Sequence, residues 1–464
     1  MKYLLFGTGD YYERYKKWFE KDEVTALLDN SLIKQNTYID GIKVVSPEEG
    51  IKLEYDVIVI LSFYTKDMKK QLLKLGVSEK SIYHFFDLYK LIPSNRKNNP
   101  ILYFHDADCT ISKCKCENKK ILLLSHDLML GGPALALFQA ANILKRYRYE
   151  IVFASMLDGQ LRQQLSEAEI PTIVDANLQV QTMKETKWVQ SFDLIICNTF
   201  NFYVFLSERN ISIPIIWWLH DSSFFYESVD EKVLRSIDTT NLTIVSVGPV
   251  PQKAYQHYVP NAEVEMLLYG VANISCDAKK IKKSNNVLFT TIGYIEARKG
   301  QDILLQAIKQ LPVEYLNKAK FYLVGQNTSL LAHRIEEQLQ DMPQIVMTGT
   351  IDRNEINMLL EYTDVLICPS REDPMPTVVA EAMMHKVPCI LSDSIGTIDY
   401  IKDNENGFIF ESGNVNQLEK KIKWCIDNYL NLSQFGIEAR KVYEKVFSME
   451  KFADNIMLYV KRYV

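Results

Sequence analysis

The chain has 464 residues, of which 47% are hydrophobic and 24% charged, and its formal net charge is −5. This length suits about three domains of ~150 residues each, and the mildly acidic charge excludes the overall positive field of a nucleic-acid-binding protein. No segment reaches the ~18 consecutive apolar residues of a membrane span, and the apolar run after Met1 is too short for a secretory signal, so we expect a cytoplasmic protein.

Residues 1–95 predict a small α/β domain. A buried strand at Tyr3–Phe6 leads to Gly7-Thr8-Gly9 and an amphipathic helix, and a second strand ends at Asp29. A strand, a glycine turn, a helix and an acid about twenty residues on form the Rossmann arrangement, but the third glycine of the full fingerprint is absent. The sequence therefore leaves a bound dinucleotide open, and favours a structural or docking role for this domain.

Residues 96–118 are polar and contain Pro100, which predicts a linker. Two short motifs within it suggest metal sites, namely Asp106-Ala-Asp108 and Cys114-Lys-Cys116 near His105. The acidic motif lacks a surrounding continuous domain, and the cysteine spacing matches no common zinc finger. The linker interpretation is favoured for both motifs.

From Lys119 onward, strand and helix patterns alternate through two successive blocks. Buried-strand runs occur at Ile121–Leu124, 151–154, 194–197, 215–219, 243–247 and 265–268 in the first block, and at 287–292, 321–324, 345–348, 365–368, 388–391 and 407–410 in the second. This alternation predicts parallel sheets covered by helices on both faces. We expect one domain over residues 119–275, another over 276–445, a crevice at the carboxyl ends of their strands, and a helix over 446–464 that crosses back.

The most informative stretch lies in the second block, where Asp373 and Glu381 are eight residues apart across a strand-to-helix turn. The preceding run Val365–Cys368 is the strand, and Pro376 opens the apolar helix. The free N–H groups and positive dipole end of such a helix suit a diphosphate. We expect Glu381 to accept paired hydroxyls, as from a ribose, while Asp373 stays on the loop. A solvated helix cap is the alternative for the acidic pair.

Residues 370–384 resemble the E-x7-E signature of the retaining glycosyltransferases of family 4. Asp373 replaces the first glutamate, and Pro374-Met375-Pro376 replaces the usual Gly-Phe-Gly. The resemblance covers residues 119–464 and implies an α/β chain of the GT-B fold. Two Rossmann-like doubly wound domains would face a cleft, and the small Rossmann-like domain would precede them.

The same resemblance assigns individual roles. Lys299 would bind the donor diphosphate; Tyr294 stands where many members have a phosphate-binding arginine, and Arg298 could replace it or lie on the outer face of the helix. His220, after the strand at 215–219, would reach the transferred sugar, with a packed structural histidine as the alternative. Other donor-binding positions would be Gly325, Gly349, Pro376, Thr377, Val378, Gly396 and Thr397. The loop Gly131-Gly132 would face phosphates or the acceptor.

The resemblance thus implies a hexosyltransferase that moves a sugar from a nucleotide-diphosphate sugar with retention of configuration, and that needs no metal or other cofactor for its chemistry. Asp373, His220, Lys299 and Glu381 would be the catalytic residues. The acceptor would be a glycan or a lipid-linked sugar in cell-surface polysaccharide synthesis.

Two alternatives remain open. A GT-B epimerase or phosphorylase would use the same site, and a non-catalytic partner subunit would usually lose the pair Lys299 and Glu381.

The basic run Lys145-Arg146-Tyr147-Arg148 is a candidate contact for anionic lipid on the inner face of the plasma membrane, although a solvated helix end is the simpler interpretation.

Overall fold

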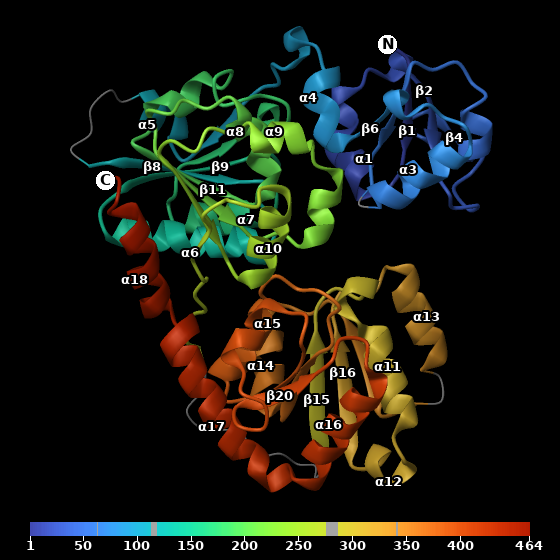
Figure 1. The fold of residues 1–464 in the computed structure, drawn as a ribbon, viewed down its shortest axis with the longest axis vertical. Coiled ribbons are helices and arrows are strands. Elements are labelled where there is room, and N and C mark those ends of the chain that lie inside the picture. The colour runs from blue at the N-terminus through green and yellow to red at the C-terminus, as the bar shows by residue number, and fades with distance from the viewer. Residues whose placement is uncertain (63, 113–117, 275–285, 340–341) are drawn as a thin grey trace. The chain divides into compact units, whose positions relative to one another are not determined.

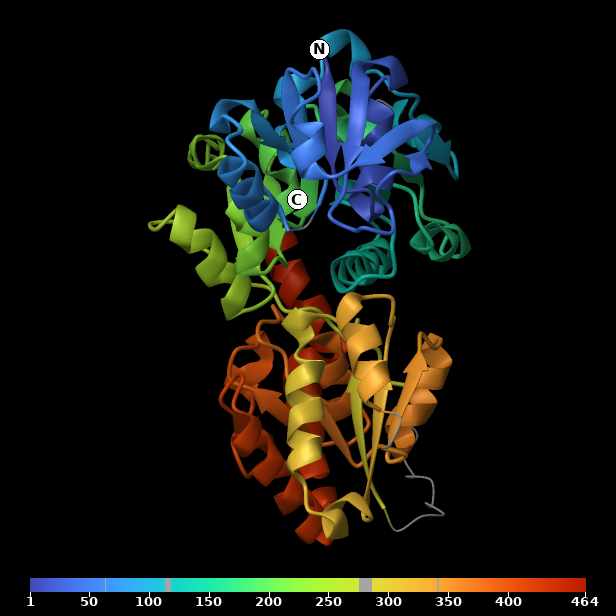
Figure 2. The same cartoon turned by 90° about the vertical axis from the view of Figure 1, so that its right-hand side faces the viewer.

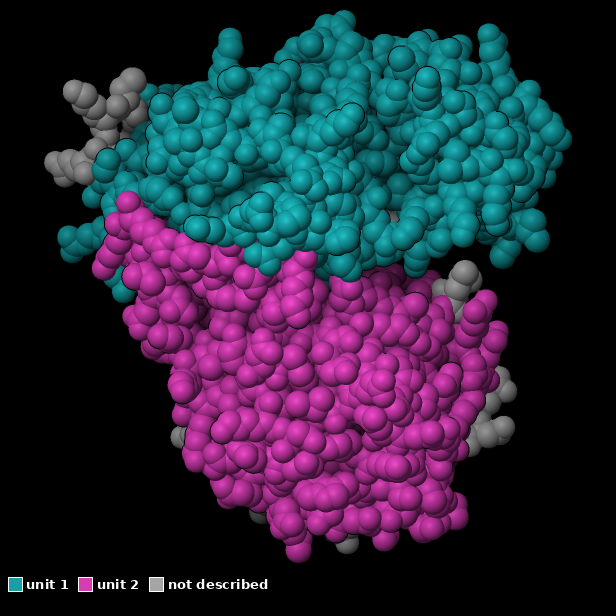
Figure 3. Space-filling view, viewed as in Figure 1, with its two compact units in different colours: residues 1–244, 254–263, 463–464 teal, residues 245–253, 264–462 magenta. Residues whose placement is uncertain are grey.

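The computed structural model describes residues 1–62, 64–112, 118–274, 286–339 and 342–464. The chain divides into two compact units (Figure 3). The first unit contains residues 1–244, 254–263 and 463–464, and the second contains residues 245–253 and 264–462. None of the helices in the described ranges combines the length and apolar character needed to cross a bilayer.

The N-terminal part of the first unit is a six-stranded sheet in the order β3-β4-β2-β1-β5-β6 (Figure 1). Its strands are β1 Tyr3–Phe6, β2 Val24–Leu28, β3 Tyr38–Ile39, β4 Ile42–Val45, β5 Val57–Ile60 and β6 Ile82–His84. All neighbours pair in parallel except β3 and β4. The chief helices are α1 Asp10–Tyr15, α3 Thr65–Lys74 and α4 Leu88–Leu91.

The glycine turn after β1 and the acid after β2 lie at one edge of this sheet, as the sequence predicts. Asp29 accepts hydrogen bonds from the Thr8 hydroxyl and from the Ser31 N–H, the latter at 2.8 Å, and the Lys34 ammonium lies 3.5 Å away. The chain's own groups therefore satisfy the carboxylate that a dinucleotide ribose would otherwise engage.

The larger sheet that lies mostly in the first unit runs in the order β14-β13-β12-β11-β8-β9-β10-β7, where β14 is Glu265–Met266. Its strands are β7 Leu102–Phe104, β8 Lys120–Ser125, β9 Glu150–Ser155, β10 Thr172–Val174, β11 Leu194–Asn198, β12 Ile215–Leu219 and β13 Leu242–Ser246, whose last two residues fall in the second unit. Its helices are α5 Ala107–Ser112, α6 Gly132–Arg146, α7 Leu161–Glu167, α8 Tyr203–Ser207 and α9 Glu231–Arg235.

Part of the segment interpreted as a linker belongs to this sheet. Residues 102–104 form the edge strand β7, which pairs antiparallel with β10, and residues 107–112 form α5. The linker interpretation of 96–118 is therefore wrong for these residues. A three-residue strand with Leu102 47% and Tyr103 41% exposed carries too little hydrophobic pattern to be recognised. Cys114 and Cys116 lie outside the described residues.

The sheet of the second unit runs in the order β17-β16-β15-β18-β19-β20 and is entirely parallel. Helices cover both of its faces (Figures 1 and 2). The strands are β15 Val287–Ile292, β16 Ala319–Val324, β17 Ile345–Gly349, β18 Val365–Cys368, β19 Cys389–Ser392 and β20 Gly407–Phe410. The helices are α11 Gln301–Gln310, α12 Val313–Leu316, α13 Leu330–Gln338, α14 Arg353–Tyr362, α15 Thr377–Met384, α16 Val415–Asp427, α17 Leu432–Val442 and α18 Met449–Val460. The helix α10 Pro249–Tyr258 is divided between the two units.

Both large sheets reverse their strand order at one point. In the second unit the reversal falls between β15 and β18, and in the first between β8 and β11. Strands that are buried along their whole length, such as β8 and β18, place their following loops at the carboxyl edge. In open α/β sheets, ligands bind outside the carboxyl ends of the strands at this reversal. Each unit therefore has one expected ligand edge.

Candidate functional site

Lys299 and Asp373 meet at the strand reversal of the second unit. Lys299 ends a short 3-10 turn after β15, and Asp373 lies on the loop after β18. The Lys299 ammonium donates to the Asp373 carboxylate at 2.5 Å. The aspartate side chain is 7% exposed and the lysine 21%, so the pair sits at the surface of a largely desolvated edge. The two predicted residues form an ion pair.

Glycines hold the loops around this pair in close backbone contact. Gly300 has a φ of +71°, and a Cβ there would lie 2.1 Å from the carbonyl oxygen of Pro369. A Cβ on Gly396 would lie 1.8 Å from the carbonyl oxygen of Pro374, next to the hydrogen bond from the Gly396 N–H to the Asp373 carbonyl at 2.9 Å. Glycine is thus required where the loops after β15, β18 and β19 meet.

The predicted turns at Gly325 and Gly349 end β16 and β17. Gly325 has a φ of +147°, and its missing side chain lets the carbonyl of Gly293 approach. Gly349 has a φ of +70° with open space beside it, so its backbone conformation alone favours glycine. Both turns lie at the carboxyl edge of the same sheet as the Lys299–Asp373 pair.

Glu381 lies on α15 and is 2% exposed. Its carboxylate pairs with Arg353 at the start of α14, whose side chain is 56% exposed. Burial raises the pKa of Glu381, and the Arg353 charge and hydrogen bonds from Arg353 and Thr377 partly offset this. A buried carboxylate with one solvent-accessible partner can exchange that partner for ligand hydroxyls.

The amino-terminal end of α15 has the predicted form. Pro376 is the N-cap with extended backbone, no side chain caps the helix, and Thr377 and Val378 form its first turn. The first N–H groups of an uncapped helix remain available to an anion. The loop from Asp373 leads directly into this turn.

Arg298 is directed at the chain itself. Its guanidinium donates to the Glu296 carboxylate at 2.7 Å and to the Glu372 carbonyl at 3.2 Å. Tyr294 is 40% exposed, and its hydroxyl lies 3.4 Å from that of Thr328. In this structure Arg298 therefore supports the loop that carries Asp373.

Three polar atoms near these loops are buried without a protein partner among the described residues. They are the Thr397 hydroxyl, the Tyr269 hydroxyl and the Gln301 side-chain oxygen. Burial raises the pKa of Tyr269, and the charges of Glu381 and Asp373 raise it further. Buried polar groups are nearly always hydrogen-bonded, which makes these three candidates for contact with a ligand.

In the first unit, His220 follows β12 at the carboxyl edge. It is 7% exposed, its ring centroid lies 4.5 Å from that of Trp218, and its Nε2 has no partner in the described chain. Burial, together with the charge of His126, lowers the pKa of His220 to about 3. The imidazole is thus neutral at physiological pH. The adjacent Asp221 accepts the Phe200 N–H at 2.6 Å.

The glycine loop of the first unit opens α6. Gly131 is the N-cap with a φ of −83°, and Gly132 is the first helical residue. A Cβ on Gly131 would meet only Pro133 at 4.0 Å, so the packing of the chain does not itself require this glycine. Asn198, at the end of β11, donates to the Pro133 carbonyl at 2.8 Å, while its own side-chain oxygen is buried without a partner in the described chain.

Sequence reasoning missed several residues at these edges. Arg353, which pairs with Glu381, lies at the start of α14. The capping box of Asp352 and Glu355 predicts this helix start, but it does not predict that Arg353 contacts Glu381. Asn198 lies in no recognisable sequence motif, so the sequence did not indicate a role for it. The predicted residues Gly131, Gly132 and His220 belong to the first unit, and all the other predicted residues belong to the second.

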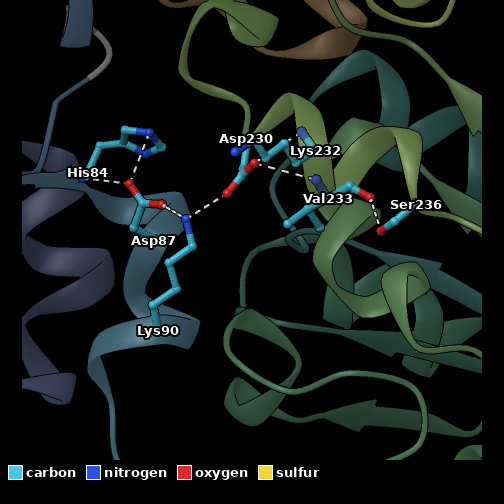
Figure 4. A network of polar contacts seen from close by, with 7 residues as sticks. All are labelled: His84, Asp87, Lys90, Asp230, Lys232, Val233 and Ser236. Atoms are coloured by element: carbon cyan, nitrogen blue, oxygen red, sulfur yellow. Dashed lines mark hydrogen bonds and ion pairs between the residues drawn. The ribbon is translucent and has the colours of Figure 1, made fainter.

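A separate hollow of about 640 Å³ lies in the first unit and contains none of the predicted residues. It is lined by His84, Asp87, Lys90, Val229, Asp230, Glu231, Lys232 and Arg235. Figure 4 shows the polar network along it, in which the Lys90 ammonium donates to Asp87 and to Asp230, each at 2.8 Å. Within the described ranges, no group of three His, Cys, Asp or Glu side chains is arranged to hold a metal ion.

Family models match three successive parts of the chain. The model for glycosyl transferases group 1 matches residues 275–442, that for glycosyl-transferase family 4 matches residues 117–243, and the model named C2185-like, N-terminal, matches residues 1–83. Residues 117–243 and 275–442 thus resemble two successive glycosyltransferase domains.

Individual relatives agree with this assignment. An uncharacterized glycosyltransferase of Haemophilus influenzae is 22% identical over 330 residues, which cover 65% of this chain and 90% of the relative. The Escherichia coli enzyme UDP-Gal:alpha-D-GlcNAc-diphosphoundecaprenol alpha-1,3-galactosyltransferase is 25% identical over 154 residues, which cover 32% of this chain and 39% of the enzyme.

Among solved structures, Anabaena HepE in complex with UDP and glucose superposes with a TM-score of 0.62 at 19% identity, over 74% of this chain and all of HepE. The predicted α/β fold of two doubly wound GT-B domains is therefore confirmed. At this identity the likeness concerns the fold, and the roles of individual side chains in the glycosyltransferase domains depend on their own geometry.

Proposed function

We propose that this chain transfers a hexose from a nucleotide-diphosphate sugar to a glycan or lipid-linked acceptor, with retention of configuration. The observation that carries the proposal is the ion pair between Lys299 and Asp373 at the strand reversal of the second unit. The buried Glu381 on the helix that follows the same loop supports it. A cation, two acids and an uncapped helix end suit the charge and hydroxyl groups of such a donor.

The second unit would bind the donor. Lys299 exchanges part of its interaction with Asp373 for the diphosphate, and the first turn of α15 with the Gly396 turn supplies N–H donors. Glu381 accepts the ribose hydroxyls in place of Arg353. Arg298 holds the Asp373 loop from behind, and the buried Thr397 hydroxyl donates to a phosphate oxygen.

The chemistry would be a substitution at the anomeric carbon on the face from which the nucleotide leaves. The bond from that carbon to the diphosphate oxygen breaks, the acceptor hydroxyl oxygen forms the new bond, and its proton passes to the departing phosphate oxygen. Asp373 fixes the sugar through its hydroxyls, and the neutral His220 offers a hydrogen-bond donor to a substrate hydroxyl. Orientation and stabilisation of the leaving diphosphate by Lys299 supply most of the acceleration, and no metal enters the scheme.

The acceptor would be a sugar on a lipid carrier or growing glycan, used for a cell-surface polysaccharide. The name of the Escherichia coli relative, which specifies a diphosphoundecaprenol acceptor, supports this class. We place the reaction on the cytoplasmic side, where nucleotide sugars are made. The basic residues Lys145 and Arg146 at the end of α6 are proposed to approach anionic lipid.

The test is a transfer assay with UDP-, GDP-, ADP- and dTDP-hexoses as donors and GlcNAc-diphosphoundecaprenol as first acceptor. We expect one donor class to give a product whose NMR coupling constant shows the anomeric configuration of the donor. Lys299→Ala should lower the rate about 100-fold, and the matched variant Lys309→Ala, whose ammonium donates to Gln338 on the surface, should not.

Other outcomes would assign another function. An altered sugar nucleotide without acceptor would indicate an epimerase, and phosphate-dependent release of sugar phosphate would indicate a phosphorylase. If Lys299→Ala and Glu381→Ala leave the cellular polysaccharide unchanged, the chain acts as a non-catalytic partner.

A further inference from the structure

The N-terminal part of the chain reaches the ligand edge of the larger sheet in the first unit. Arg14, on α1, places its Nη1 3.5 Å from the Oδ2 of Asp127, on the loop after β8. The aspartate side chain is only 8% exposed. Because β8 adjoins the strand reversal, this contact lies where a ligand of this sheet is expected.

Asp127 organises the loop that leads to Gly131 and α6. Its Oδ1 accepts the Met129 N–H at 3.1 Å, and its carbonyl accepts the Ser125 hydroxyl at 2.7 Å. Its Oδ2 lies 3.3 Å from Nε2 of His126, whose Nδ1 lies 3.4 Å from the Thr199 hydroxyl after β11. The carboxylate that Arg14 contacts therefore fixes side chains on both strands at the reversal.

Tyr11, one turn before Arg14, lies at the same edge. Its ring centroid is 5.7 Å from the Arg14 guanidinium carbon and 4.8 Å from the ring of Phe85. Burial is the main cause that raises the pKa of Tyr11 to about 12; the charge of Arg14 lowers the pKa, and those of Asp127 and Asp221 raise it. Tyr11 therefore packs between Arg14 and Phe85.

Contacts on either side hold α1 in this position. The Phe86 ring packs on Phe200 and Tyr203 with centroid separations of 6.1 and 5.7 Å. The Trp18 indole N–H donates to Gln179 at 2.7 Å. The Lys90 network of Figure 4 joins α4 to Asp230 just before α9. Residues 1–95 are therefore anchored on both sides of the edge they reach.

We infer that Arg14 is a positioning residue of the transfer reaction, which holds Asp127 and, through it, His126 against Thr199, so that the N-terminal domain forms a wall of the acceptor-binding edge. The inference rests on the proposed transferase function. It gives residues 1–95 a role in acceptor binding rather than in nucleotide binding, in agreement with the internally satisfied carboxylate of Asp29.

The test compares the full chain with Arg14→Ala, the conservative Arg14→Lys and the matched control Arg96→Ala, whose guanidinium pairs with Glu23 of the N-terminal domain. Amide hydrogen exchange over residues 126–131 should accelerate about 10-fold in Arg14→Ala only. With UDP-galactose and GlcNAc-diphosphoundecaprenol, KM for the acceptor should rise about 10-fold at an unchanged donor KM. Arg14→Lys should restore most of both effects.

A double-mutant cycle locates the effect. If Arg14 acts through Asp127, Arg14→Ala combined with Asp127→Asn should cost no more in kcat/KM than the larger single change. Unchanged exchange at residues 126–131 in a folded Arg14→Ala, or equal rises in the donor and acceptor KM, overturns the inference. The hydrogen-exchange measurement needs no turnover, so it tests the link between Arg14 and residues 126–131 even if the wild-type chain transfers no sugar. A wild-type chain that transfers no sugar would count against the proposed function alone.

Discussion

At the scale of single residues, the candidate site depends on ionisable groups taken out of water. Asp373 is buried and paired with Lys299, whereas Glu381 is buried more deeply and paired with an arginine that is mostly exposed. A buried acid whose cationic partner is solvent-screened costs folding stability in its charged form. The chain tolerates this cost at Glu381, which is typical of a position kept for binding.

Glu381→Gln tests this interpretation. The pKa of Glu381 is raised in the folded chain, so the charged carboxylate destabilises the fold above that pKa and the cost disappears as the pH falls through it. Glutamine should therefore leave the thermal midpoint at pH 8 unchanged or higher, while kcat/KM for the donor falls about 100-fold. A large loss of stability without a specific loss of donor use would show a structural role.

For His220 we expect the opposite change of stability with pH, namely a loss as the pH falls. Its pKa falls from 6.5 to about 3 on folding, so the unfolded chain takes up a proton between these values while the folded chain does not. The contribution of His220 to the free energy of unfolding is fully present above about pH 6.5, and it is lost as the pH falls toward 3. In urea titrations, His220→Gln should lose less stability than the wild type between pH 7 and pH 4. Parallel pH profiles would mean that the imidazole is solvated.

At the scale of elements, the site is a set of loops that glycines allow to touch. The loops after β15, β18 and β19 pack backbone to backbone at Gly300 and Gly396. Strand and turn order was predictable from the sequence, because buried parallel strands such as Val365–Cys368 are continuous apolar runs that end at a glycine or proline. The pairing of Arg353 with Glu381 was not, because it joins two helices through tertiary packing.

Gly396→Ala should disrupt this set of loops. The new Cβ would overlap the Pro374 carbonyl, so the loop that carries Asp373 must move, at a cost of about 2–3 kcal/mol in unfolding free energy. Gly9→Ala is the comparison, because Gly9 has a φ of −99° and nothing within 4 Å of a Cβ. Denaturant unfolding should separate the two variants, and equal stabilities would mean that the turn relaxes freely.

At the scale of the whole molecule, three α/β sheets share one chain, and sequence pattern located all three. The short edge strand β7 escaped prediction because it is exposed, and β10 because it has only three residues. The contact between Arg14 and Asp127 spans 113 positions along the sequence and leaves no local signal. Sequence could therefore predict which loops lie at the carboxyl edges, but not which side chains from residues 1–95 join them.

The central claim is that Lys299 and Glu381 belong to a site for a nucleotide-diphosphate sugar in the second unit. Isothermal titration of UDP, GDP, ADP and dTDP, each with its glucose conjugate, into the full chain tests it most directly. We predict saturable binding of one nucleotide class, weakened at least about 10-fold by Lys299→Ala and unchanged by Lys309→Ala. Binding that is unaffected by Lys299→Ala, or no binding of any nucleotide sugar, would contradict the account.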